Sequence, residues 1–176
     1  MQIHIRTERE KDHQDVFQLV EKAFAQEEYS DHKEQYLVER LRKSDAFIPA
    51  LSLVAELDKD IIGFILLTKI HIDNGANSFH ALALAPVVVH PDFQHKGIGG
   101  QLIREAHKKA KELGYQRIVL LGHAEYYPRF GYERTSKYNI RLPFEAPEEN
   151  CMIIGLNPGA MKGVSGTVVY PSAFYE

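Results

Sequence analysis

The sequence of 176 residues lacks the features of secreted, membrane-spanning and nucleic-acid-binding proteins. It contains one cysteine, Cys151, so no intramolecular disulfide can form, and its N-terminus lacks the apolar core of a signal peptide. No apolar run approaches the ~20 residues of a membrane span. Its 21 basic and 24 acidic side chains leave no basic excess for binding a phosphate backbone. These absences predict a cytoplasmic protein that binds neither nucleic acid nor membrane.

Hydrophobic periodicity predicts one α/β domain of the α+β type over residues 1–176. Asp31 and Glu34 are expected to form a capping box at the start of the second of its helices. Apolar residues at helical spacing predict helices over 10–25, 31–43 and 98–113, with a short helix within 125–130. Alternating and β-branched runs predict strands over 3–5, 51–56, 61–72, 79–89, 116–121, 138–142, 152–156 and 164–170.

The segment Gln94–Gly100, between a predicted strand and a predicted helix, is rich in glycine. Gly97, Gly99 and Gly100 lack a Cβ, so the backbone there can approach a ligand closely and can adopt positive φ. Unpaired N–H groups and the dipole at a helix start favour an anion. His95 and Lys96 add positive charge at the rim. We therefore expect this segment to hold a pyrophosphate, and a tight turn with glycines for packing alone is the alternative.

Two other phosphate-binding loops fit this segment poorly. The dinucleotide-binding fingerprint requires a glycine three residues after Gly99, where Leu102 stands, and normally follows the first strand of a βαβ unit. A P-loop ends in Gly-Lys-Ser or Gly-Lys-Thr, whereas Lys96 precedes Gly97 here.

The strand before the glycine-rich segment contains Pro86, followed by Val87, Val88 and Val89. Because proline has no N–H, pairing on one side of this strand is expected to be interrupted. Free backbone donors and acceptors can then bind an extended ligand that carries amides, such as the pantetheine arm of coenzyme A (CoA). An ordinary buried core strand is the alternative.

Residues 94–99 resemble motif A of the GNAT superfamily of N-acetyltransferases, Gln/Arg-x-x-Gly-x-Gly/Ala. Residues 127–132 resemble a bacterial branch of small acetyltransferases with the pattern Tyr-x-Arg-Phe-Gly-Phe/Tyr. The resemblance implies an acetyl-CoA-dependent N-acetyltransferase with a single-domain GNAT fold, in which helices flank a mixed, mostly antiparallel sheet. The residues that it implies for coenzyme binding are Val87, Val88, Val89, Gln94, His95, Lys96, Gly97, Ile98, Gly99 and Gly100.

The resemblance also implies direct attack on the acetyl thioester by a primary amine of a small molecule or a peptide. Tyr127 matches the family tyrosine beside the coenzyme sulfur and is expected to be the general acid, with Tyr126 as the adjacent alternative. An alkylamine with a pKa near ~10.4 is protonated at pH 7, so a base or a water chain is expected. His123 is the first candidate base, because strand ends in open α/β sheets commonly face the ligand. The other candidate bases are His80, His90, Glu56 and Glu125.

Other chemistries find less support in the sequence. Cys151 lies in an apolar strand-like segment and is expected to be a small buried hydrophobe, not the nucleophile of a ping-pong route. His90 and His95 lack a cysteine or carboxylate at a metal-ligand spacing, so no metal site is expected. A non-catalytic CoA-binding or sensing module, or a transferase of longer acyl chains, would share these motifs. The acceptor and the oligomeric state, a homodimer included, stay open.

Overall fold

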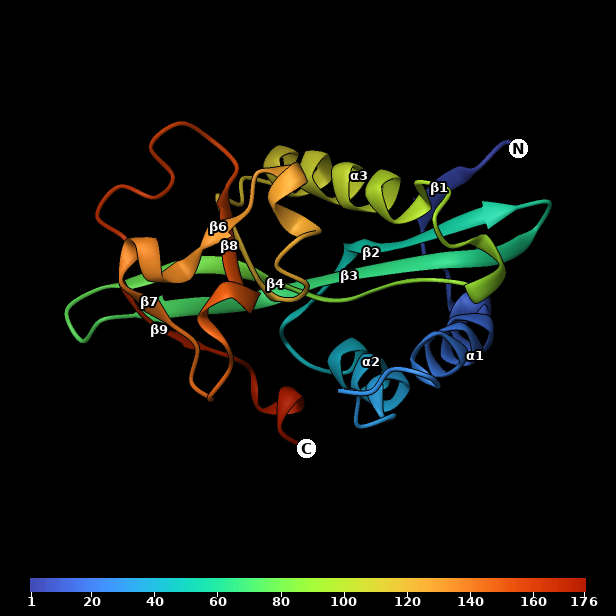
Figure 1. Ribbon diagram of the computed structural model, residues 1–176, viewed down its shortest axis with the longest axis horizontal. Helices are drawn as coiled ribbons and strands as arrows, with labels where there is room; N and C mark the ends of the chain where they lie inside the picture. Colours follow the sequence, from blue (N-terminus) through green and yellow to red (C-terminus); the bar gives the residue numbers. More distant parts are fainter.

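A mixed sheet of nine strands with helices on both faces organises the computed structural model, which describes residues 1–176 (Figure 1). The strands are β1 (His4–Thr7), β2 (Phe47–Leu57), β3 (Asp60–Asp73), β4 (Ser78–Val89), β5 (Arg117–Leu121), β6 (Glu133–Arg134), β7 (Ile140–Arg141), β8 (Cys151–Gly155) and β9 (Gly166–Val169). The α-helices are α1 (His13–Phe24), α2 (Glu34–Arg42) and α3 (Ile98–Glu112). The 3-10 helices are η1 (Glu10–Asp12), η2 (Pro91–Phe93), η3 (Tyr127–Phe130), η4 (Thr135–Tyr138), η5 (Glu148–Asn150) and η6 (Ser172–Phe174).

Most neighbouring strands run antiparallel, as the sequence predicts. The main strand order is β1-β2-β3-β4-β5-β8-β6, and β9 pairs with both β3 and β7. Strands β1 to β4 pair antiparallel in chain order, with α1 and α2 between β1 and β2, after which the chain crosses through α3 to place β5 parallel to β4. β8 then pairs antiparallel with β5 and with β6. The crossover puts the end of β4, the start of α3 and the end of β5 in one region of the molecule.

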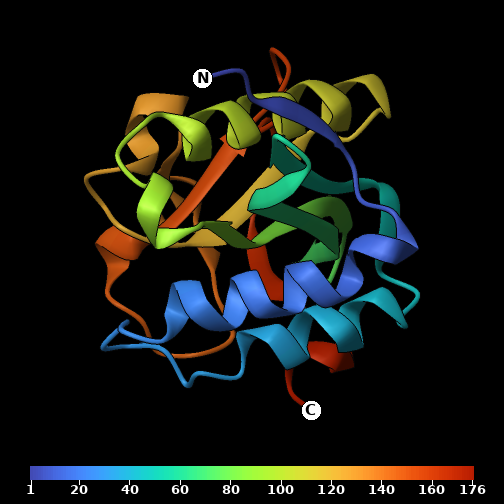
Figure 2. The ribbon, with the colours of Figure 1, turned by 90° about the vertical axis from the view of Figure 1, so that its right-hand side faces the viewer.

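The helices cover opposite faces of the sheet. Figure 2 shows α3 on one side, and α1 with α2 on the other. The apolar stripe of α3, which includes Leu102 and Ala106, is buried against sheet residues such as Leu67. Val16 of α1 packs with Phe64 in a second core on the opposite face. No helix in the chain combines the length and apolar character that a membrane crossing requires.

Local structure departs from the sequence expectation at the start of α2 and in the strand expected over 138–142. Lys33 is the N-cap residue of α2 and makes no side-chain cap, and the Asp31 carboxylate accepts from the Lys33 N–H at 2.9 Å, so the expected capping box does not form. The strand expected over 138–142 shortens to Ile140–Arg141. It shortens because η4 extends to Tyr138 and Asn139 takes a left-handed conformation with φ of 55°.

Candidate active site

A gap between β4 and β5 forms the centre of the site. The two strands pair only where Leu82 faces Ile118 and Ala83 faces Val119. A register shift follows in the pairing of β4 with β3, so that Ala85 and Pro86 together oppose the single residue Leu66. This bulge bends β4 at the expected interruption. Beyond it, the β4 edge that faces β5 has no paired strand.

Backbone amides of Val87 and Val89 point into this gap. The His90 N–H donates to the Ile62 carbonyl of β3 at 2.8 Å. Hydrogen-bonded and non-hydrogen-bonded pairs alternate along an antiparallel ladder. Val88, which lies opposite Phe64 and two residues before His90, therefore also directs its N–H and C=O groups toward β3. The N–H and C=O groups of Val87 and Val89 face away from β3. The free strand edge therefore presents two N–H groups to a ligand.

The start of α3 closes one end of the gap. Gly97 is its N-cap residue, with φ of 82°, and the first intrahelical hydrogen bond runs from the Gln101 N–H to the Gly97 carbonyl at 3.1 Å. The N–H groups of residues 98–100 thus lack intrahelical acceptors and can bind an anion. Gly99 and Gly100 lie within the helix and have no positive φ, so their missing Cβ atoms leave room for neighbouring groups to come close to the backbone. A Cβ on Gly99 would lie 3.0 Å from the Tyr126 hydroxyl.

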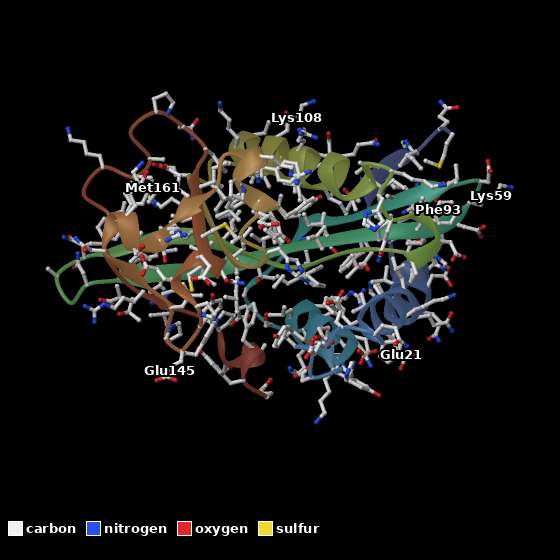
Figure 3. All side chains as sticks on the ribbon, viewed as in Figure 1. Glu21, Lys59, Phe93, Lys108, Glu145 and Met161 are labelled. Carbon is white, nitrogen blue, oxygen red and sulfur yellow. The ribbon has the colours of Figure 1, made fainter.

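One cavity of about 690 Å³ joins these elements and brings together all the sequence-predicted site residues except Val88 and Lys96. The Val88 side chain is buried on the sheet face covered by α1, and the Lys96 ammonium lies 5.8 Å from the centre of the Phe93 ring. Figure 3 labels Phe93, on η2 beside the start of α3. The lining residues are Val87, Val89, Phe93, Gln94, His95, Gly97, Ile98, Gly99, Gly100, Arg104, His123, Tyr126, Tyr127, Arg129 and Phe130.

Two arginines in the lining were not predicted from the sequence. Arg104 follows Gly100 by four residues and therefore shares its helix face, so the helical spacing alone could have placed Arg104 beside the glycine-rich segment. Its guanidinium lies 4.9 Å from the centre of the Phe130 ring. Arg129 donates from Nε to the Tyr126 carbonyl at 2.9 Å and stacks 4.8 Å from the Tyr126 ring. Both cations add positive charge to a cavity that already contains a helix N-terminus.

Tyr126 and Tyr127 have different environments. The Tyr127 side chain is buried, with 9% exposed, and burial raises its pKa well above the usual range, so the phenol is protonated at neutral pH. Its ring packs edge-to-face on Tyr132, with ring centres 5.8 Å apart. A Cβ on Gly122 would collide with the same ring. Tyr126 is half-buried, and its hydroxyl points at the start of α3.

His123 is the one candidate base that lines the cavity. It lies just after β5 and is exposed. Glu56 is instead paired with Arg6 at 2.8 Å, whereas His80 and His90 line other cavities. Glu125 is exposed and does not line the cavity.

Cys151 lies outside this cavity. It is buried at the start of β8, and burial together with the nearby Glu148 raises the pKa of its thiol. A raised pKa disfavours the nucleophilic thiolate. Cys151 is therefore the buried hydrophobe that the sequence predicts.

Comparisons with known proteins agree with this geometry. Residues 4–135 match the family model for the acetyltransferase (GNAT) domain. YjhQ of Escherichia coli K12, an uncharacterized N-acetyltransferase, is 37% identical over 119 residues, which are 67% of this chain and 66% of that protein. The crystal structure of E. coli YhbS with CoA has a TM-score of 0.89 and 25% identity, covering 100% of this chain and 93% of that chain. A Brucella melitensis GNAT acetyltransferase with acetyl-CoA has a TM-score of 0.81 and 34% identity, covering 98% of each chain. Because the family model matches most of its length, the chain belongs to the GNAT family of acetyltransferases.

Proposed function

We propose that this protein transfers the acetyl group of acetyl-CoA to a primary amine of a small molecule or a peptide. The observation that carries the proposal is the single cavity that joins the free edge of β4, the N-terminus of α3 and Tyr127. YhbS binds CoA and the B. melitensis relative binds acetyl-CoA in their crystal structures, which supports the same co-substrate here.

The cavity fits the shape and charge of the coenzyme. The pantetheine arm carries amides that can pair with Val87 and Val89 as an added strand would. The pyrophosphate fits the free N–H groups at the start of α3, where the helix dipole favours negative charge. Arg104 and Arg129 offer further positive charge to the phosphates. Val88 contributes indirectly, because its pairing with β3 holds its two neighbours in place.

The chemistry needs an oxyanion donor and a proton donor at the sulfur. The amine nitrogen attacks the thioester carbonyl, and the N–H of Val89 stabilises the negative charge that develops on the carbonyl oxygen. As the C–S bond breaks, Tyr127 donates its hydroxyl hydrogen to the departing sulfur. A CoA thiol has a pKa of roughly 8.5, below that of the buried phenol, so a hydrogen bond to the thiolate carries most of the stabilisation.

His123 is the proposed base. Removing the proton of an alkylammonium at pH 7 costs roughly 4–5 kcal/mol, so an acceptor near the nitrogen is needed. The imidazole of His123 borders the same cavity as Tyr127 and can accept that proton directly or through water. The alkylammonium loses one proton to His123 before the attack. The second proton, lost as the amide forms, replaces the hydrogen that Tyr127 gives to the sulfur, so the products are the amide, free CoA and one released proton.

A non-catalytic CoA-binding module is the alternative function. Free thiol released from acetyl-CoA in the presence of a panel of primary amines distinguishes the two. The acetyltransferase is supported if at least one amine stimulates release and Tyr127→Phe abolishes that stimulation without weakening CoA binding. If CoA binds and no amine stimulates release, the module is the better description. Longer acyl-CoA thioesters in the same assay test the acyl-chain preference.

A further inference from the structure

Three residues of α3 form a stripe that holds the segment following Tyr127. Gly100, Arg104 and His107 are spaced four and three residues apart, so they share one helix face. A Cβ on Gly100 would lie 3.4 Å from the Phe130 ring, and Arg104 stacks on the same ring. His107 continues the stripe beyond the cavity. The helix that begins at the glycine-rich loop thus also fixes residues 130–132.

His107 makes the last contact of this stripe, with Tyr132. Its Nε2 lies 2.8 Å from the Tyr132 hydroxyl oxygen, within hydrogen-bond distance. Burial and the nearby positive charge of Arg104 lower the pKa of His107 to about 4, so the imidazole is neutral at pH 7. With its ring proton on Nδ1, Nε2 accepts the hydrogen of the Tyr132 hydroxyl. Tyr132 is 3% exposed, and water cannot readily replace this partner.

Tyr132 in turn contacts the proposed acid. The rings of Tyr127 and Tyr132 meet edge-to-face at an interplanar angle of 76°. Gly122 leaves room for the Tyr127 ring on the β5 side, so the ring lies in a closely packed site. In a packed interior, displacement of one ring displaces its neighbour. A chain of direct contacts therefore runs from His107 through Tyr132 to Tyr127.

We infer that His107 is a positioning residue, which fixes the Tyr127 hydroxyl at the departing sulfur through its hydrogen bond to Tyr132. The inference rests on the proposed function, in which Tyr127 is the proton donor. His107 does not line the cavity and touches neither substrate. Loss of its hydrogen bond should therefore lower kcat and leave the KM for acetyl-CoA unchanged, because the strand edge and the loop that bind the coenzyme stay intact.

The test compares four variants at saturating acceptor and varied acetyl-CoA, which gives both kcat and the KM for acetyl-CoA. His107→Leu removes the acceptor and Tyr132→Phe removes the hydroxyl while keeping the ring. Since small displacements of a reacting group cost up to about 100-fold, we expect each variant to lower kcat about tenfold, with KM for acetyl-CoA within about twofold. His107→Gln keeps an acceptor and should restore most of the activity. Lys108→Leu is the matched control, because Lys108 is the exposed next residue on α3 and projects into solvent (Figure 3).

A double variant separates positioning from a general loss of structure. If both residues act through one hydrogen bond, His107→Leu combined with Tyr132→Phe should lower kcat no further than either change alone. Multiplied effects would overturn the inference. A lower melting temperature with kcat within about twofold of the parent would also overturn it, because a purely structural contact behaves in that way.

A second readout is independent of turnover. In the NMR spectrum of protein with isotope-labelled tyrosine, the Tyr127 ring resonance should move in Tyr132→Phe and His107→Leu and stay in place in Lys108→Leu. If the parent protein transfers no acetyl group, the proposed function fails and this spectrum still decides whether His107 positions Tyr127. An unmoved Tyr127 resonance in Tyr132→Phe would overturn the positioning role, even in an active enzyme.

Discussion

The hydroxyl of Tyr126 lies 3.0 Å from the position that a Cβ on Gly99 would occupy, at the N-terminus of α3. The adjacent Tyr127 ring packs edge-to-face on Tyr126, with ring centres 5.1 Å apart, and also lies against Gly122 and Tyr132. Both tyrosines line one cavity. We propose that Tyr126 contacts the phosphates of the coenzyme and that Tyr127 contacts its sulfur.

Tyr126→Phe should weaken coenzyme binding and spare the chemical step. Loss of one hydrogen bond to a charged group costs about 1.5 kcal/mol or more, so the KM for acetyl-CoA should rise about tenfold. The kcat at saturation should stay within about twofold, because the sulfur keeps its donor. Steady-state thiol release measures both constants. A fall in kcat at unchanged KM would assign Tyr126 to catalysis instead.

Gly99→Ala should separate binding from stability. The new Cβ would press on the Tyr126 hydroxyl and reduce the space above the helix N-terminus. Coenzyme affinity should fall about tenfold, whereas alanine in a helix is favoured over glycine by up to about 1 kcal/mol. Calorimetric titration with CoA and thermal unfolding measure the two effects. Unchanged affinity would show that the phosphates do not approach Gly99.

Arg129→Gln should reduce CoA affinity in a salt-dependent way. The substitution removes the proposed charge-assisted contact to a phosphate, while Arg104 remains in the cavity lining. We expect roughly three- to tenfold weaker binding at low salt, and a smaller difference from the parent at high salt because ions screen exposed charges. Lys111→Gln, an exposed change near the C-terminal end of α3, is the control. Equal losses in both variants would show only a net-charge effect.

The stability of the protein should fall as the pH drops from 6.5 to 4. The pKa of His107 is lowered from 6.5 to about 4 by burial and by Arg104, so in this window the unfolded chain binds more protons than the folded one. This lowering of the His107 pKa corresponds to about 3 kcal/mol of unfolding free energy. The contribution is present above pH 6.5 and is lost toward pH 4. Chemical denaturation of the parent and of His107→Gln measures it. Equal slopes for the two proteins would contradict this origin.

The parts of the site that depend on local backbone geometry were predictable from the sequence. Gly97 marks the start of α3 because a left-handed residue precedes a periodic apolar run. Pro86 marks the interruption of β4 because it cannot donate to a ladder. Both features depend only on residues that are adjacent in the chain, so they can be recognised without knowledge of the fold.

The parts that depend on distant contacts were not predictable. Arg129 joins the cavity only because η3 folds back over the start of α3, where Phe130 meets Gly100. In the sequence, nothing distinguishes His107 from other polar helix residues. Its role depends on the contact with Tyr132, which lies 25 positions later in the chain. The strand expected over 138–142 shortens to β7, which pairs with β9, because η4 extends to Tyr138 and Asn139 takes a left-handed conformation.

Acetyl transfer assisted by Tyr127 is the central claim, and the kcat of Tyr127→Phe tests it most directly. The measurement is thiol release from saturating acetyl-CoA with an accepted amine, in protein shown by titration to bind CoA as the parent does. A general acid contributes about 100-fold or more, so we predict a loss of kcat of at least that size. A kcat equal to that of the parent would contradict the assignment of Tyr127 as the proton donor.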